Sequence, residues 1–196
     1  MQGGLQVNSF DQRVGRRAVL QAGVALGIEL GLCGKGLAQE DAASQRPKEG
    51  DLFVKVGDST ATPLRPADLP LGGKQTMAWP MDPADNTLRN GSRLNRVMLL
   101  RMDAEKLSPE TKSRAADGVV AYTAICTHTG CEVTEWVPEE QLLYCPCHES
   151  KFEPKDGAKV VDGPAPRMLP ALPLKLTEGK LAVAKPFTAP VAFEVQ

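Results

Sequence analysis

The chain has 196 residues, of which 42% are hydrophobic and 24% are charged, and its formal net charge is −1. This composition is that of a globular protein with a buried core, and it excludes a disordered chain of low hydrophobicity. Because 23 basic residues are balanced by 24 acidic ones, the sequence indicates no basic surface for a nucleic acid, and a nucleic acid is not an expected partner.

The N-terminal part has the pattern of an export signal. Arg16 and Arg17 stand at the start of an apolar run over residues 18–32, an order that resembles a twin-arginine (Tat) signal. The run is shorter than the about 20 apolar residues of a membrane span, and it contains Glu29. Residues 1–38 are therefore interpreted as a Tat signal that is cleaved, with a retained membrane anchor as the alternative. The expected location is the periplasm, with attachment to the inner membrane if the anchor is retained.

The rest of the chain has the pattern of β-structure. Residues 39–50 are polar and short of large apolar side chains, which indicates a flexible linker. From residue 51 onward short apolar runs are separated by Gly, Pro, Asn and Asp, so we expect an all-β domain over residues 51–196. A short helix is expected within residues 103–116, capped by Asp103. The predicted strands are 52–56, 75–79, 96–101, 119–125, 133–137, 141–143, 159–161, and a hairpin of 174–177 with 180–184.

Two hexapeptides contain both histidines and four of the five cysteines of the chain. The first is Cys-Thr-His-Thr-Gly-Cys at residues 126–131, and the second is Cys-Pro-Cys-His-Glu-Ser at residues 145–150. Two thiolates and two imidazoles match the ligands of a Rieske centre, a [2Fe–2S] cluster with two Cys on one iron and two His on the other. A Cys2His2 zinc site uses the same ligand types, and four cysteines of an exported protein can instead form two disulfides. Zinc sites seldom hold an additional cysteine beside each Cys–His pair, and two disulfides leave the histidines unexplained.

These patterns, C-T-H-x-G-C and C-P-C-H-x-S, resemble the Rieske iron–sulfur family over roughly residues 119–176, as does Gly-Pro-Ala-Pro at residues 163–166. The resemblance implies Rieske-type stacked antiparallel sheets, with a small cluster-binding subdomain formed by two loops at about residues 124–168. It implies that one iron, the buried one, is held by Cys126 and Cys145. The exposed iron is then held by His128 and His148. The two remaining cysteines, Cys131 and Cys147, are interpreted as a disulfide that joins the two loops.

The same resemblance identifies residues that tune the cluster. Ser150 stands where a hydroxyl of the family donates a hydrogen bond to a bridging sulfur and raises the potential. Phe152 stands where high-potential respiratory members have a tyrosine, so one such hydrogen bond is expected to be missing. Gly163, Pro164 and Pro166 belong to the segment that resembles the loop covering the cluster. Since the disulfide is typical of higher-potential members, we expect a value in the upper-middle part of the roughly −150 to +300 mV span of Rieske centres.

The resemblance implies a one-electron carrier that is not catalytic alone, since the chain has no further histidine to serve as a base. The first expectation is the small subunit of an exported oxidoreductase similar to arsenite oxidase. That subunit receives electrons from a molybdenum subunit and passes them to a c-type cytochrome or a copper protein. Thr129 and Glu149 favour this expectation, because respiratory members usually have an apolar residue and a glycine there.

Three alternatives stay open. The first is the Rieske subunit of a membrane quinol–cytochrome c reductase, with cytochrome b as its larger partner, and the second is a stand-alone Rieske electron carrier. The third is a binding module with a structural metal, which a reversible one-electron wave would exclude.

Overall fold

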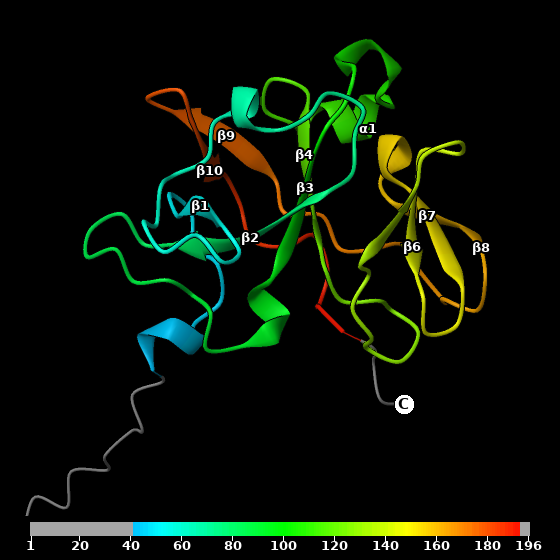
Figure 1. Ribbon diagram of the computed structural model, residues 1–196, viewed down its shortest axis with the longest axis horizontal. Coiled ribbons are helices and arrows are strands. Elements are labelled where there is room, and N and C mark those ends of the chain that lie inside the picture. Colours follow the sequence, from blue (N-terminus) through cyan, green and yellow to red (C-terminus); the bar gives the residue numbers. More distant parts are fainter. Residues whose placement is uncertain (1–40, 193–196) are drawn as a thin grey trace, which may run out of the picture. The chain divides into compact units, whose positions relative to one another are not determined.

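The computed structural model describes residues 41–192, which belong to one compact unit, and the expected Tat signal lies outside them. The described residues form two antiparallel sheets with almost no helix (Figure 1), which confirms the expected all-β fold. In this part of the chain no helix is long and apolar enough to cross a membrane.

The larger sheet, here called the base sheet, has the strand order β4-β3-β2-β1-β10-β9. Strands from both ends of the described chain meet in it, because β1 pairs with both β2 and β10. Its strands are β1 (Leu52–Lys55), β2 (Thr76–Met81), β3 (Val97–Arg101), β4 (Val119–Thr123), β9 (Leu174–Thr177) and β10 (Lys180–Val183).

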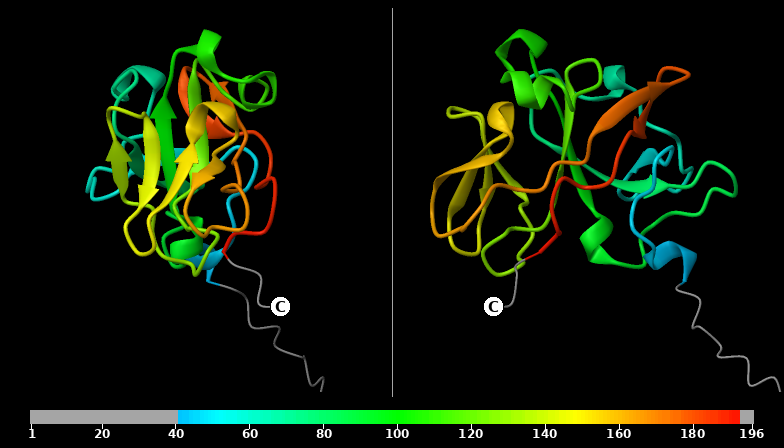
Figure 2. Two further views of the ribbon diagram at one scale, coloured as in Figure 1. Left: turned by 90° about the vertical axis from the view of Figure 1, so that its right-hand side faces the viewer. Right: turned by 180° about the vertical axis from the view of Figure 1, so that it is seen from behind.

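The second sheet, here called the small sheet, is inserted in the chain between β4 and β9 and has the order β5-β6-β7-β8. Figure 2 shows it as a separate layer beside the base sheet. Each strand pairs with its neighbour in sequence, so the sheet is a meander of hairpins. Its strands are β5 (Glu135–Val137), β6 (Leu142–Cys145), β7 (Ser150–Glu153) and β8 (Lys159–Asp162).

The helical segments are short and lie in the connections. One α-helical turn, α1 (Pro109–Lys112), accompanies five 3-10 turns among the described residues. The 3-10 turns are η1 (Ala42–Ser44), η2 (Pro66–Asp68), η3 (Arg93–Asn95), η4 (Ala104–Lys106) and η5 (Pro154–Asp156).

Strands β3 and β4 are apolar over most of their length because both of their faces are buried. Successive side chains of a strand point to opposite faces. Val97 and Leu99 of β3 join one core cluster, whereas Met98 and Leu100 join another. The second cluster also contains Leu143 and further side chains of the small sheet. The two sheets therefore share a core, and β3 is at its centre.

The expected helix within residues 103–116 is divided into two short turns. Asp103 caps η4, as predicted, by accepting a hydrogen bond from the Glu105 backbone N–H. Pro109 ends any continuity with α1, since the residue before a proline is disfavoured in the helical region. Ser108 accordingly is extended, with ψ 153°, and serves as the N-cap of α1.

Two further expectations differ from the structure. Strand β7 was not expected, because only Ser150 and Phe152 point inward and one of them is polar. The part of the expected flexible linker that is described, residues 41–50, is folded against the base. The Gly91 N–H donates to the Ala43 carbonyl at 2.9 Å, and the Asn95 amide donates to the Gln45 carbonyl at 2.8 Å.

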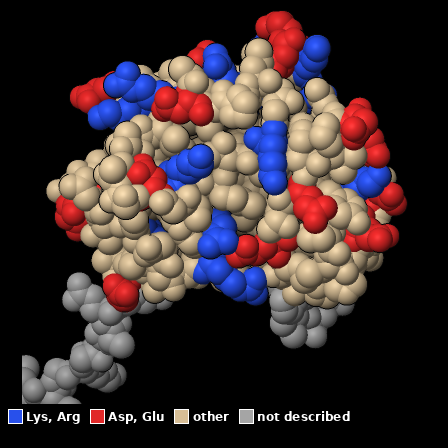
Figure 3. Space-filling view, viewed as in Figure 1, with Lys and Arg blue, Asp and Glu red and all other residues tan. Residues whose placement is uncertain are grey.

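A buried ion pair holds the ends of β1 and β2 together. Arg89 and Asp51 are 1% and 2% exposed, and the guanidinium donates to both carboxylate oxygens of Asp51. It also donates to Asp82, directly after β2, at 3.1 Å. The ion pair of Lys175 with Glu49, in contrast, is exposed to solvent. On the face of the molecule shown in Figure 3, charges of both signs are interspersed.

Replacement of Arg89 by Met should destabilise the fold strongly, because it leaves the Asp51 carboxylate buried without its partner. A broken buried pair costs about 3–5 kcal/mol, which lowers the thermal midpoint of a domain of this size by about 10 °C. The matched control is Lys175→Met, which removes an exposed pair that contributes less than about 1 kcal/mol. Scanning calorimetry at one heating rate checks both variants, and equal midpoints would contradict the stabilising role of Arg89.

Candidate metal centre

The first hexapeptide forms a tight loop, here called loop 1 (residues 126–131), shortly after β4. Its ends are joined by the Cys126 N–H, which donates to the Cys131 carbonyl at 2.8 Å. The Gly130 N–H donates to the Cys126 carbonyl at 3.1 Å. Gly130 has φ +78°, a left-handed conformation that glycine adopts without strain. The loop can therefore close within six residues.

The second hexapeptide, here called loop 2 (residues 145–150), connects two paired strands. Cys145 is the last residue of β6 and Ser150 is the first residue of β7, and these two residues are paired. The Glu149 N–H donates to the Cys145 carbonyl at 3.0 Å. Glu149 has φ +63°, a region that favours glycine, so its side chain is placed there at a cost of about 1 kcal/mol or more. Loop 2 is thus anchored at both ends by the small sheet.

The structure brings the four expected ligands together from the two loops. Cys126 and Cys145 are free thiols, and each is 1% exposed. The imidazoles of His128 and His148 are adjacent, with ring centroids 4.6 Å apart and perpendicular planes. His128 is half-buried and His148 is exposed. The arrangement therefore has a buried sulfur side and an outer imidazole side.

The buried thiols are unfavourable as anions without a cation. Burial raises the pKa of the Cys126 thiol to about 11, and the neighbouring Cys145 sulfur contributes to the increase. The neighbouring His128 backbone N–H and Ser150 hydroxyl act in the opposite direction and lower this pKa. A metal that binds here therefore displaces protons from the thiols as it stabilises the thiolates.

An unpaired imidazole nitrogen supports the same interpretation. His128 Nδ1 is buried and has no hydrogen-bond partner among the described residues. A buried polar atom without a partner costs about 1–3 kcal/mol, and coordination to a metal would satisfy it. Within residues 41–192 no three His, Cys, Asp or Glu side chains converge as around one metal ion. A [2Fe–2S] cluster with two protein ligands per iron needs no such group, so the residues present fit a cluster of the Rieske type.

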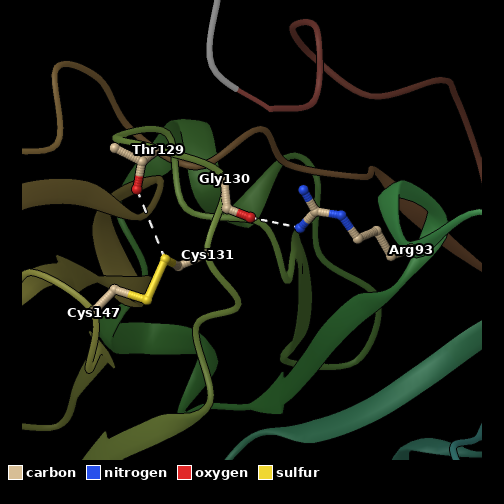
Figure 4. Close-up of a disulfide and its surroundings, with 5 residues drawn as sticks. All are labelled: Arg93, Thr129, Gly130, Cys131 and Cys147. Atoms are coloured by element: carbon tan, nitrogen blue, oxygen red, sulfur yellow. Dashed lines mark hydrogen bonds between the residues drawn. A yellow bond between two sulfur atoms is a disulfide. The ribbon is translucent and has the colours of Figure 1, made fainter.

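A disulfide joins the two loops. Cys131 of loop 1 and Cys147 of loop 2 are bonded, with their Cα atoms 6.4 Å apart (Figure 4). The Thr129 hydroxyl lies 3.7 Å from Cys131 Sγ. The expected disulfide is therefore present, and it connects two loops that otherwise belong to different parts of the fold.

A third segment, here called the cover loop (residues 163–166), packs against loop 2. Gly163 has φ +84°, and a Cβ atom at this position would lie 2.5 Å from the Ser150 Cα atom. The Ala165 N–H donates to the Ser150 hydroxyl at 3.1 Å. Only glycine therefore fits at residue 163. Both prolines of this loop, Pro164 and Pro166, are exposed.

Two of the expected tuning residues lie inward. Ser150 is 1% exposed, and Phe152 is fully buried in the same core cluster as Cys126 and Cys145. The Phe152 ring has no hydroxyl to donate a hydrogen bond, as the sequence indicates.

Two residues that hold loop 1 were not expected from the sequence. The Thr127 hydroxyl donates to the Arg167 carbonyl at 2.6 Å, which connects loop 1 with the segment after the cover loop. Arg93 of η3 donates from Nη1 to the Gly130 carbonyl at 2.6 Å (Figure 4). The sequence gives a weak indication of the role of Thr127, since it is a polar residue between two expected ligands. For Arg93 the sequence contains no signal, because the two partners are 37 residues apart.

Comparisons with known proteins support a metal centre of the Rieske type. The model of the Rieske [2Fe–2S] domain matches residues 85–173. The cytochrome bc1 complex Rieske iron–sulfur subunit of Streptomyces lividans is 33% identical over 147 residues, which cover 73% of this chain and 85% of that protein. The subunit with the same name from Corynebacterium glutamicum is 32% identical over 173 residues, covering 76% of this chain and 42% of that protein. The chain thus spans nearly all of one relative and about two fifths of the other.

Among solved structures, the soluble domain of the Rieske protein II from Sulfolobus acidocaldarius has 24% identity and a TM-score of 0.41. The match covers 51% of this chain and 65% of that one. The match of this chain to the family model and its similarity to the S. lividans protein together show that it is a member of the Rieske iron–sulfur protein family. Its cofactor is therefore a [2Fe–2S] cluster.

Proposed function

We propose that the chain is the Rieske electron-transfer subunit of a quinol–cytochrome c reductase, a complex of the cytochrome bc1 type. The similarity that carries this proposal is the 33% identity with a cytochrome bc1 Rieske subunit over 85% of that protein. The main sequence expectation, a subunit similar to that of arsenite oxidase, has no comparable support. In the proposed complex the larger partner is a cytochrome b, and a c-type cytochrome accepts the electron.

The proposed ligand set is the one that the two loops bring together. Cys126 and Cys145 hold the inner iron, because their thiols are buried beside each other. His128 and His148 hold the outer iron, because their rings are adjacent at the outer side of the site. When bound, the cluster supplies a reversible one-electron carrier.

The exposed histidine is the residue that meets the electron donor. His148 is exposed, whereas His128 is half-buried, so His148 presents the ring nitrogen that does not bind iron. In its deprotonated form this nitrogen would accept a hydrogen bond from a quinol hydroxyl and take up its proton as the quinol is oxidised. Loop 2 keeps the imidazole in place, because both of its ends belong to paired strands.

Ser150 sets part of the reduction potential. Its oxygen accepts a hydrogen bond from the Ala165 N–H, and its hydroxyl is near enough to the Cys126 sulfur to lower the pKa of that thiol. A donor to a sulfur ligand stabilises the reduced and more negative state, so Ser150 raises the potential.

One observation favours the second candidate, an arsenite-oxidase-like complex with a molybdenum subunit. Thr129 and Glu149, which follow His128 and His148 in the sequence, are exposed polar residues. A carboxylate there suits a polar protein surface better than an apolar quinol pocket. The partner experiment below distinguishes the two candidates.

We also propose that the domain works on the periplasmic side of the membrane after Tat export. The support is the order of Arg16, Arg17 and the apolar run that follows. Tat transports folded proteins, which suits a chain that must receive its cluster before export. Replacing both arginines by lysine should keep the protein in the cytoplasm, as cell fractionation would show.

The ligand set can be tested by iron analysis and EPR. The purified protein should contain two irons and two sulfides per chain, and its reduced state should give a rhombic EPR signal with two nitrogen ligands resolved by pulsed EPR. His148→Ala should lose this signal, whereas Glu149→Gln, a change to the neighbouring exposed residue, should keep it. A colourless protein with one zinc per chain would contradict the proposed ligand set.

The contact between the cover loop and Ser150 can be tested by substitution. Gly163→Ala places a Cβ atom against Ser150, so the cover loop must move and water reaches the site. The visible absorbance of the cluster should then bleach at least about tenfold faster in air, as a displacement costing 1.4 kcal/mol would produce. Gly179→Ala is the matched control, because Gly179 also has a positive φ, +75°, but no atom lies within 4 Å of its Cβ position. Equal bleaching rates in the two variants would show that the contact with Ser150 is not needed.

The partner can be identified by purification from the host membrane. Affinity purification of the full chain from detergent-solubilised membranes of its host should recover a cytochrome b subunit, and quinol should reduce the cluster in that preparation. Recovery of a molybdenum subunit, without reduction by quinol, would overturn the proposed function in favour of the second candidate.

A further inference from the structure

Arg93 contacts loop 1 from the side of the base sheet. It is the first residue of η3, in the connection that leads to β3. Its Nη1 donates to the Gly130 carbonyl oxygen at 2.6 Å (Figure 4). Because the donor carries a positive charge, this is a charge-assisted hydrogen bond, which is stronger than a bond between neutral groups. A carbonyl of the loop that holds two expected ligands is therefore polarised from outside the site.

The Gly130 carbonyl and the Cys131 N–H belong to the same peptide unit. No peptide bond in residues 41–192 is cis, and in a trans peptide the C=O and N–H groups point in opposite directions. The Cys131 N–H therefore points away from Arg93. Figure 4 shows Arg93 on one side of Gly130 and the disulfide on the other. Among the described residues the Cys131 N–H has no protein acceptor, so it is available to a group held between the loops.

We propose that Arg93 is a positioning residue that raises the reduction potential of the cluster through the Gly130–Cys131 peptide. A positive charge at the carbonyl end of a peptide makes its N–H a stronger donor, since linked hydrogen bonds polarise one another. A stronger donor near the sulfur atoms stabilises the reduced, more negative state. Arg93 thus acts on the cluster without contacting a ligand. The inference rests on the ligand set proposed above.

A second arginine of the same segment provides the matched control. Arg96 donates from Nη1 to the Glu132 carboxylate at 2.8 Å, directly after loop 1, and its guanidinium lies 4.8 Å from the Trp79 ring centroid. It therefore contacts a side chain and not a peptide carbonyl of loop 1. Because Glu132 compensates its charge, Arg96 is expected to have a much smaller effect on the potential.

The test is protein-film voltammetry on the cluster-loaded full chain, with EPR of the reduced state as a second readout. Arg93→Met should lower the midpoint potential and shift the EPR g values, whereas Arg93→Lys, which keeps a charged donor, should restore most of the wild-type potential. Arg96→Met should lower the potential less than Arg93→Met does. A wild-type potential in Arg93→Met with an intact Rieske spectrum would overturn the inference, as would an equal decrease in Arg96→Met.

A replacement variant and the EPR spectrum of the wild-type protein complete the test. If Arg93→Met fails to retain the cluster, Arg93→Gln replaces it, since glutamine keeps a donor without the charge. A lower potential in Arg93→Gln than in Arg93→Lys supports the inference, and equal potentials overturn it. A wild-type protein without a Rieske EPR signal would instead contradict the proposed ligand set, which is a separate result.

Discussion

Two buried sulfur atoms impose the constraint on which the site depends. Cys126 and Cys145 lie beside each other away from water, where thiolates are stable only if a cation compensates their charge. They come from different loops, so the protein must hold the two loops together whether or not a cation compensates the charge of the thiolates. The disulfide of Cys131 with Cys147 provides a covalent connection. The cover loop and the residue that follows it provide a non-covalent connection, since Ala165 donates to Ser150 of loop 2 and Thr127 of loop 1 donates to the Arg167 carbonyl.

The base sheet holds this assembly by a shared core. Side chains on one face of β3 and β4 pack against the small sheet, and those on the other face pack within the base. Tyr122 extends this contact, since its hydroxyl donates to the Pro154 carbonyl at 2.7 Å. Burial raises the pKa of this tyrosine, so its hydroxyl stays neutral and remains a donor at neutral pH.

The sequence predicts those parts of the site that depend on residues lying close together in the chain. The ligand hexapeptides could be recognised because each contains its Cys, its His and its additional Cys within six residues. The central strands could be predicted because an uninterrupted apolar run such as 97–100 requires burial on both faces. The long-range contacts could not be predicted: Arg93 with Gly130 and Thr127 with Arg167 join residues 37 and 40 positions apart. The fold of residues 41–50 escaped prediction for a related reason, since its backbone groups bond residues far along the chain, as Ala43 does with Gly91 and Gln45 with Asn95.

Loop 2 begins and ends on two paired residues of neighbouring strands, and this has a consequence for electron-transfer rates. The rate of a one-electron step depends on how far the surrounding atoms must rearrange when the charge changes. Dipoles that are already fixed in place require little rearrangement at that moment. A hairpin closed at Cys145 and Ser150 leaves the ligands of loop 2 little freedom to move. The reorganisation energy of this centre should therefore be small, and the distance to the docked partner should govern its rate.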